Sequence, residues 1–255
     1  MKHTIKKVLQ KLLGIHTYLV VFSLFVMLKL RWDRNEKDFL TFLKLVPDQG
    51  NILDIGANIG VMTRFFSKYK KKATIFSFEP IPFNYKVLKR IIRLLGLKNV
   101  KTFPVAVGEK EHEIEMIIPK ERSVTMHGLC HVKDINGSDE SEGENVKTKM
   151  ICLDTFDELK NSSSFVSAIK LDVENYECHV LKGAIKIIQN DKPLIYTELW
   201  DNENRKLCVE IMEKNQYNTF IFTNHKLVPY LPHKGTGQNF VFLPKDVKLN
   251  SSVIA

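Results

Sequence analysis

Hydrophobic and polar positions along the chain alternate between short apolar runs and longer segments with helical spacing. The apolar runs predict β-strands at residues 51–56, 73–79, 100–107, 166–173, 193–199, 219–223 and 238–244. Helical spacing predicts helices at residues 33–46, 59–70, 82–96, 176–190 and 202–215. Strands that alternate with helices, with central strands apolar on both faces, indicate an α/β fold with a mainly parallel sheet covered on both sides.

One segment, residues 108–150, interrupts this alternation. Its pattern predicts a strand at 113–119, a polar loop at 131–146 and a second strand at 147–153. We expect a hairpin insertion with a flexible polar tip. Both a plain surface excursion and a lid that contacts the substrate fit this pattern.

The most apolar window of the chain is residues 12–30, which has Lys and Arg on both sides. Its uninterrupted part is about the shortest length that crosses a bilayer as a helix. Three interpretations stay open: a helix packed on the domain or on a membrane surface, a spanning anchor, and a signal peptide, which the lack of a cleavage site disfavours. We therefore divide the chain into an apolar and basic helical segment (1–32) and one domain (33–255). We expect a cytoplasmic protein that can associate with the cytoplasmic side of a membrane through residues 12–30.

The composition fits a globular protein of 255 residues, and its formal net charge is +9. A basic protein can bind nucleic acid, but much of the excess lies near the N-terminus and in the turn "KYKKK" (68–72), and no aromatic residues interleave with it as an RNA-binding motif requires. We therefore expect no nucleic-acid partner. Four widely spaced cysteines without a CxxC motif predict buried, reduced thiols: Cys130, Cys152, Cys178 and Cys208.

The first predicted strand ends in the turn "DIGANIG", where an acid precedes two glycines and a helix follows. A dinucleotide-binding turn reads G-x-G-x-x-G, but here Asn58 stands in the place of the middle glycine, between Gly56 and Gly60. The acid, Asp54, would repel a pyrophosphate and attract a cationic amino group, while the glycines let the backbone pass close to a ligand. This combination suits S-adenosylmethionine, whose methionine end carries an ammonium and a sulfonium. The alternative is that Asp54, and Glu79 at the end of the second strand, only cap helices.

Further acids lie at the ends of the other central strands. Glu79 ends the second strand, where a carboxylate can accept hydrogen bonds from both ribose hydroxyls of a nucleoside. Lys170, Asp172 and Glu174 alternate along one strand, so they are predicted to share a face. Glu198 lies near the end of the next strand. Because charged groups are costly to bury without partners, we expect these side chains at the mouth of a site.

Together these motifs resemble the FkbM family of S-adenosylmethionine-dependent methyltransferases. The matching stretches, in the family's order, are "LDIGANIG" (53–60), "FEPIPFNY" (78–85), "IKLDVENYECHVLKGA" (169–184) and "YTEL" (196–199). The resemblance implies a class I methyltransferase (Rossmann-like) fold, with a doubly wound sheet of about seven strands whose last strand is antiparallel. It also implies S-adenosyl-L-methionine as the cofactor, held by Asp54, Gly56, Ala57, Asn58, Gly60, Glu79 and Asn84.

One position departs from the family's pattern. Glycine is usual after "DVE", and here Asn175 takes its place. Asparagine tolerates a left-handed backbone better than most residues, so the turn should survive. Its side chain, however, would change the pocket of the methyl acceptor.

The resemblance usually implies O-methylation of a hydroxyl, which is a poor nucleophile at neutral pH and benefits from a base. Asp172 is our first candidate for the base, and Glu174 and Glu198 are the alternatives. His127 and His131 in the insertion are less favoured. We expect no metal ion, although two acids at the strand ends would suit a hard cation.

The predicted activity is methylation of a sugar, a glycolipid or a related small molecule, with the oligomeric state left open. Two other functions remain as alternatives. One is a membrane-associated binding module with the same fold and no catalysis. The other is an NAD-dependent oxidoreductase, for which Tyr85 and Lys89 have the required spacing but lie on the wrong helix.

Overall fold

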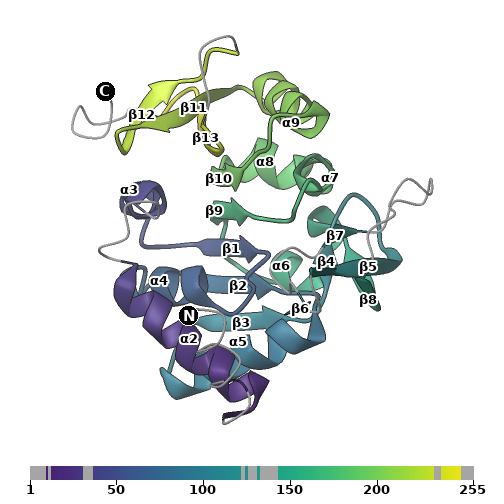
Figure 1. Cartoon of the computed structure of the whole chain (residues 1–255). Coiled ribbons are helices and arrows are strands. Elements are labelled where there is room, and N and C mark those ends of the chain that lie inside the picture. Colours follow the sequence, from purple (N-terminus) through teal and green to yellow (C-terminus); the bar gives the residue numbers. More distant parts are fainter. Residues whose placement is uncertain are drawn as a thin grey trace.

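A central sheet of eight strands organises the computed structural model, which describes residues 10, 13–30, 37–121, 124–125, 131–132, 143–232 and 237–247 (Figure 1). The strands follow the order β12 (Lys226–Pro229), β11 (Tyr217–Thr223), β13 (Asn239–Pro244), β10 (Leu194–Glu198), β9 (Val166–Leu171), β1 (Asn51–Ile55), β2 (Thr74–Phe78) and β3 (Val100–Phe103). Strands β3, β2, β1, β9 and β10 pair in parallel, while β13 pairs antiparallel with both β10 and β11.

The predicted doubly wound sheet with an antiparallel last strand is therefore confirmed. The prediction was wrong about the strand at 100–107, which ends at Phe103 and resumes as β4 (Ala106–Val107). Pro104 lies at the break, where its missing N–H cannot donate to a neighbouring strand. Strand β12 was not predicted; it extends the sheet as an antiparallel neighbour of β11.

The helices form two layers, one on each face of the sheet. The first layer contains α2 (Ile15–Lys29), α3 (Lys37–Leu45), α4 (Val61–Tyr69) and α5 (Pro82–Leu94). The second contains α6 (Asp157–Lys160), α7 (Glu177–Lys182), α8 (Ile185–Asp191) and α9 (Glu203–Lys214), with the short turn η1 (Leu153–Thr155) ahead of them. Neighbouring strand residues point to opposite faces, so Ile52 packs in the core of the first layer and Leu53 in that of the second.

The predicted helix at 176–190 is two helices, α7 and α8, which separate at Gly183. A Cβ at Gly183 would lie 2.0 Å from the carbonyl oxygen of Gly108, so the backbones of these two glycines touch. The first turn of α8 is then capped by Asp154, whose carboxylate accepts hydrogen bonds from the amides of Lys186 and Ile187. The break thus follows from a contact between residues distant in sequence.

The insertion forms a second sheet rather than a simple hairpin. Its strands are β4, β8 (Gly143–Ile151), β5 (His112–Glu121) and β6 (Val124–Thr125), and β7 (His131–Val132) pairs with β5. The predicted antiparallel pairing of two long strands is confirmed in β5 and β8. The predicted loop at 131–146 is partly strand, and its tip lies outside the described residues. Met116 and Met150 join Ile81 in a core that fixes this sheet to the domain.

The apolar N-terminal segment folds as α2, which packs across α4 and α5 in the outermost position (Figure 1). Val20, Met27 and Leu30 are buried in this contact. Within the part of the chain that the structure describes, no helix has the length and apolarity needed to cross a membrane. Of the three interpretations, the structure shows a helix packed on the domain.

Candidate functional site

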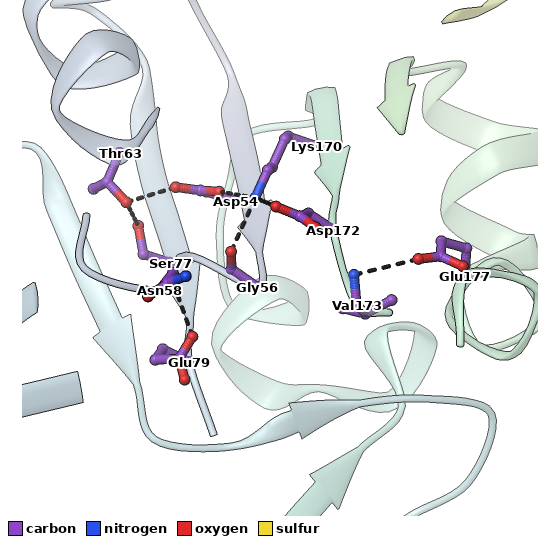
Figure 2. Close-up of polar contacts among 10 residues, drawn as sticks. All are labelled: Asp54, Gly56, Asn58, Thr63, Ser77, Glu79, Lys170, Asp172, Val173 and Glu177. Atoms are coloured by element: carbon purple, nitrogen blue, oxygen red, sulfur yellow. Dashed lines mark hydrogen bonds and ion pairs between the residues drawn. The ribbon is translucent and has the colours of Figure 1, made fainter. Parts of the chain in front are cut away.

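Two cavities open where the carboxyl ends of the parallel strands meet. This edge of an open α/β sheet is where ligands generally bind. Figure 2 shows that Asp54, Glu79 and Lys170 with Asp172 gather here, because β1, β2 and β9 all end at this edge. Glu198, at the end of β10, lines the second of the two cavities.

The turn between β1 and α4 is built on three left-handed residues. Gly56, Asn58 and Gly60 have φ angles of 74°, 49° and 83°. A Cβ at Gly56 would lie 1.9 Å from the carbonyl oxygen of Asp172, and one at Gly60 would lie 2.7 Å from Leu88 Cδ1. Glycine at residue 56 is thus required by the close approach of the chain after β9, which draws the turn tightly against the strand ends.

Glu79 follows β2 and is 4% exposed. One carboxylate oxygen accepts a hydrogen bond from the Asn58 amide at 2.8 Å, and the other accepts one from the Ile81 amide at 3.0 Å and one from Asn84 Nδ2 at 3.4 Å. Burial raises the pKa of Glu79 to about 7, against the opposing effect of these hydrogen bonds and of Lys170. The carboxyl group of Glu79 is thus fixed in position, but its ionisation is costly.

The first cavity lies between the glycine turn, Glu79 and the insertion. Its wall takes in four of the residues predicted to hold the cofactor, Gly56, Asn58, Glu79 and Asn84. The other three predicted residues are buried and do not line this cavity: Asp54, Ala57 and Gly60.

The opposite wall of the first cavity is apolar. It includes Ile81, Ala106, Val107 and Met116. Because Ala106 belongs to β4 and Met116 to β5, the insertion forms part of the cavity and is more than a surface excursion.

Asp54, Lys170 and Asp172 form a charge network at the ends of β1 and β9, and it extends from the buried Asp54 to the two cavities (Figure 2). Asp54 accepts a hydrogen bond from the Thr63 hydroxyl at 2.5 Å, and its other oxygen lies 3.5 Å from Lys170 Nζ. Lys170 Nζ also lies 3.4 Å from the Asp172 carboxylate and donates to the Gly56 carbonyl at 2.9 Å. Burial lowers the pKa of Lys170, but Asp172 and Asp54 outweigh it and raise that pKa above its ordinary value. Lys170 therefore stays charged between two acids.

This network changes the expected role of Asp54. Its carboxylate is engaged by Thr63 and Lys170, so a contact with the amino group of a ligand stays a prediction. The sequence marked Lys170 and Asp54 separately, but it gave no sign that they form a pair across β9 and β1.

The second cavity, of about 430 Å³, lies over the ends of β9, β10 and β13. Its lining is mostly polar and consists of Met62, Lys170, Leu171, Asp172, Tyr196, Glu198, Gln238 and Asn239. The Asp172 side chain is 47% exposed and lines both cavities. Burial and the nearby charge of Asp172 raise the pKa of Glu198, while Lys170 opposes the shift.

The predicted alternation of Lys170, Asp172 and Glu174 stops early because β9 ends at Leu171. Glu174 and Asn175 have φ angles of 44° and 66°, so the chain turns and Glu174 lines the first cavity. The prediction that Asn175 keeps a left-handed turn is confirmed.

The side chain of Asn175 is directed to a neighbouring helix. Its Oδ1 accepts a hydrogen bond from Asn202 Nδ2 at 2.6 Å, and Asn202 is the N-cap of α9. An effect of Asn175 on the acceptor pocket, as expected from the sequence, stays a prediction.

Sequence reasoning missed Glu177, which is buried beside this turn. Its carboxylate accepts hydrogen bonds from the Val173 amide at 3.3 Å and from Asn204 Nδ2 at 2.5 Å, and burial raises its pKa. Glu177 therefore ties the loop after β9 to α9, and Figure 2 shows its contact with Val173 in that loop. An acid two residues after the left-handed pair, in the first turn of a helix, was the available signal.

The remaining candidates are the Cys/His cluster of the insertion, a metal site, and the pair Tyr85 and Lys89. His127, Cys130 and the side chain of His131 lie outside the described residues. Within the described ranges no three His, Cys, Asp or Glu side chains form a group that could hold a metal ion. The Tyr85 hydroxyl is 3.1 Å from Thr102 Oγ1 of β3, and Lys89 lies over its ring.

Comparison with protein families matches residues 54–236 to the family described as "Methyltransferase FkbM domain". Among curated proteins, "Methyltransferase 1" of Beauveria bassiana (strain ARSEF 2860) is 24% identical over 149 residues, which cover 54% of this chain and 59% of that protein. "Methyltransferase sdnD" of Sordaria araneosa is 25% identical over 159 residues, which cover 54% of this chain and 61% of that protein. The chain thus spans about three fifths of the length of these relatives.

A solved structure of similar fold is the methyltransferase FkbM from Methylobacillus flagellatus KT. The two structures align with a TM-score of 0.51 at 15% sequence identity, over 77% of this chain and 44% of that one. At this identity the likeness shows the fold, which is that of class I methyltransferases.

Proposed function

Because the chain belongs to the FkbM family of S-adenosyl-L-methionine-dependent methyltransferases, we propose that it transfers a methyl group to a hydroxyl of a sugar, glycolipid or related small polar molecule. The observation that carries this proposal is the position of Asp172, which lines both cavities. A base at the junction of a cofactor cavity and an acceptor cavity lies where it can take the proton from the acceptor hydroxyl that attacks the methyl group. The proposal assigns this activity to residues 33–255.

The first cavity fits the proposed cofactor. One oxygen of Glu79 accepts hydrogen bonds from the Ile81 amide and Asn84 Nδ2, while the other accepts only from the Asn58 amide and keeps acceptor capacity for a ribose hydroxyl. The apolar wall of Ile81, Val107 and Met116 suits the flat face of an adenine. At Gly56 the backbone can approach a ligand that a Cβ would keep away. When bound, the cofactor supplies an electrophilic methyl group on its sulfonium.

The second cavity fits a small acceptor rich in hydroxyls. Carboxylates accept hydrogen bonds, and amide side chains both donate and accept. Asp172 and Glu198 provide the former, and Gln238 and Asn239 provide the latter. A sugar ring needs this mixture of partners, and it leaves Asp172 to accept the proton of the attacking hydroxyl.

Lys170 and Asp54 serve as positioning groups. The Lys170 ammonium lies 3.4 Å from the Asp172 carboxylate and 3.5 Å from that of Asp54. It therefore orients Asp172, the proposed base. Because Asp54 is fully buried, Lys170 is fixed in turn. Orientation of this kind contributes to catalysis by holding the reacting groups in line.

The test is turnover with purified protein. We expect S-adenosylhomocysteine to form when S-adenosyl-L-methionine is supplied with a panel of monosaccharides and glycolipids, and the product to gain a methyl group by mass spectrometry. Calorimetry with S-adenosyl-L-methionine and NAD is the first control. Tighter binding of NAD would overturn the methyltransferase proposal, and cofactor binding without turnover on every acceptor would support a binding module instead.

A further inference from the structure

The outward face of α2 is apolar, although it does not contact the rest of the domain. Phe25 and Leu28 are 60% and 66% exposed, while Val20 and Met27 on the opposite face are buried. The exposed side chains follow helical spacing on one side and form what we call the apolar ridge, consisting of Val21, Phe22, Phe25 and Leu28. Contiguous exposed apolar side chains mark surfaces that bind a partner.

The apolar ridge is held in a fixed orientation. Ser23 Oγ, on the buried face of α2, donates a hydrogen bond to the carbonyl of Ile59 at 3.1 Å. About two turns earlier, the His16 ring stacks on Phe83 of α5 with the centroids 4.2 Å apart. Ile59 belongs to the glycine turn, so this hydrogen bond ties α2 to the turn that follows β1.

The charged side chains of α2 and of the two helices that it packs on have a single sign. Helices α2, α4 and α5 contain no Asp or Glu, and their cationic residues are Lys29, Arg64, Lys68, Lys86, Lys89, Arg90 and Arg93. The second helical layer differs, because several of its cations pair with acids of the same helix, as in Lys206–Glu203 and Lys214–Glu210. The surface around α2 is therefore complementary to a negatively charged partner.

A cationic cleft of about 210 Å³ separates α2 from α5. Its lining is His16, Val20, Lys86, Val87 and Arg90. Lys86 and Arg90 are exposed, and they stand beside the helix that carries the apolar ridge. A cleft with two cations can receive a phosphate group.

We propose that the apolar ridge and the cationic cleft dock the protein on the surface of a bilayer rich in anionic lipids. Helices that lie in a membrane interface combine apolar and aromatic side chains with neighbouring Lys and Arg, and each basic residue near such a surface adds attraction. Phe25 and Leu28 enter the boundary between headgroups and acyl chains, while Lys86 and Arg90 contact phosphate headgroups. This inference is independent of the proposed acceptor.

The test is sedimentation of the full chain with vesicles of phosphatidylcholine, with and without phosphatidylglycerol. We expect binding to the anionic vesicles, and at least tenfold weaker binding for the double variant Phe25→Ser with Leu28→Ser. We expect a similar loss for Lys86→Glu with Arg90→Glu. All four side chains are exposed, so circular dichroism and the melting temperature should match those of the parent protein.

Two matched controls separate docking from general surface effects. Leu231→Ser changes an apolar side chain that is 52% exposed elsewhere, and Lys206→Glu with Lys214→Glu reverses two charges on the second helical layer. Both controls should bind the anionic vesicles as the parent does. Equal binding by the ridge variant, or no binding by the parent, would overturn the proposal. So would a dimer in light scattering that the ridge variant converts to a monomer, because the ridge would then face a second copy.

Discussion

The two cavities at the carboxyl edge of the sheet are constructed in different ways. In the first, Glu79 is buried and each of its carboxylate oxygens is held by a backbone amide. In the second, Asp172 and Glu198 are partly exposed, and the charge of Asp172 helps to raise the pKa of Glu198. The first cavity is preorganised for one ligand. The second keeps its acids accessible, as proton transfer and a variable acceptor require.

The comparison is most strongly tested at Asp172. We expect Asp172→Asn to lower turnover by about a hundredfold to ten-thousandfold, because the amide keeps the shape but cannot accept the proton. Cofactor affinity should change little, since Glu79 carries that contact. The measurement is S-adenosylhomocysteine formation together with calorimetry. Near-normal turnover of the variant would show that another residue is the base. Loss of cofactor binding would assign Asp172 to the first cavity alone.

The next largest effect is expected at Glu79. A hydrogen bond to a charged group contributes about 1.5–3 kcal/mol, so above pH 7, where Glu79 is ionised, Glu79→Gln should weaken cofactor binding at least tenfold in calorimetry. The matched control is Glu177→Gln, which alters another buried acid that holds the loop after β9. If both variants lose affinity equally, the effect is one of folding, and Glu79 has no special contact with the cofactor.

The raised pKa of Glu79 also predicts a pH dependence of stability. The folded protein keeps the proton up to a pKa of about 7, whereas the unfolded chain releases it near the ordinary value of 4.5. The folded state therefore binds more protons between these values, and its free energy of unfolding should fall by about 3 kcal/mol as pH rises through this window.

Urea unfolding at pH 5 and pH 7.5 measures this dependence. Glu79→Gln cannot ionise, so its free energy of unfolding should change less over the same interval. Identical slopes in the parent and the variant would show that Glu79 is ionised throughout the range.

A smaller effect is expected for Glu198, which lines the second cavity but not the first. The variant Glu198→Gln should raise the KM for the acceptor by roughly fivefold, the value of one hydrogen bond, with kcat within a factor of two or so. Steady-state kinetics at saturating cofactor make this measurement. A collapse of kcat with an unchanged KM would instead identify Glu198 as the base.

The smallest effect is expected for Asn175→Gly. Glycine accepts the φ of 66° without strain, and the change removes the hydrogen bond to Asn202. We expect a loss of about 1 kcal/mol in stability and nearly unchanged turnover. A large rise in turnover on a bulkier acceptor would show that the asparagine side chain restricts the acceptor cavity.

Local patterns in the sequence predicted much of the fold. Apolar runs located the seven strands predicted outside the insertion, although the one at 100–107 is divided into β3 and β4. The glycine turn and Glu79 lie together as expected. The sequence did not predict features that depend on contacts between distant residues. The helix predicted at 176–190 breaks at Gly183, where the backbone touches Gly108. The spacing of apolar residues along one segment cannot indicate such a contact with another segment. In the same way, Lys170 was expected at the mouth of the site but lies buried between Asp54 and Asp172.

The position of β13 has a consequence for the order in which the chain can fold. Strands β10 and β11 are joined through β13, which follows both in the sequence. During synthesis the N-terminal part emerges first, so β10 and β11 expose unpaired edges until residues 239–244 arrive. Such edges are templates for aggregation. Because Gln238 and Asn239 line the second cavity, the proposed acceptor site is completed only when this last strand inserts.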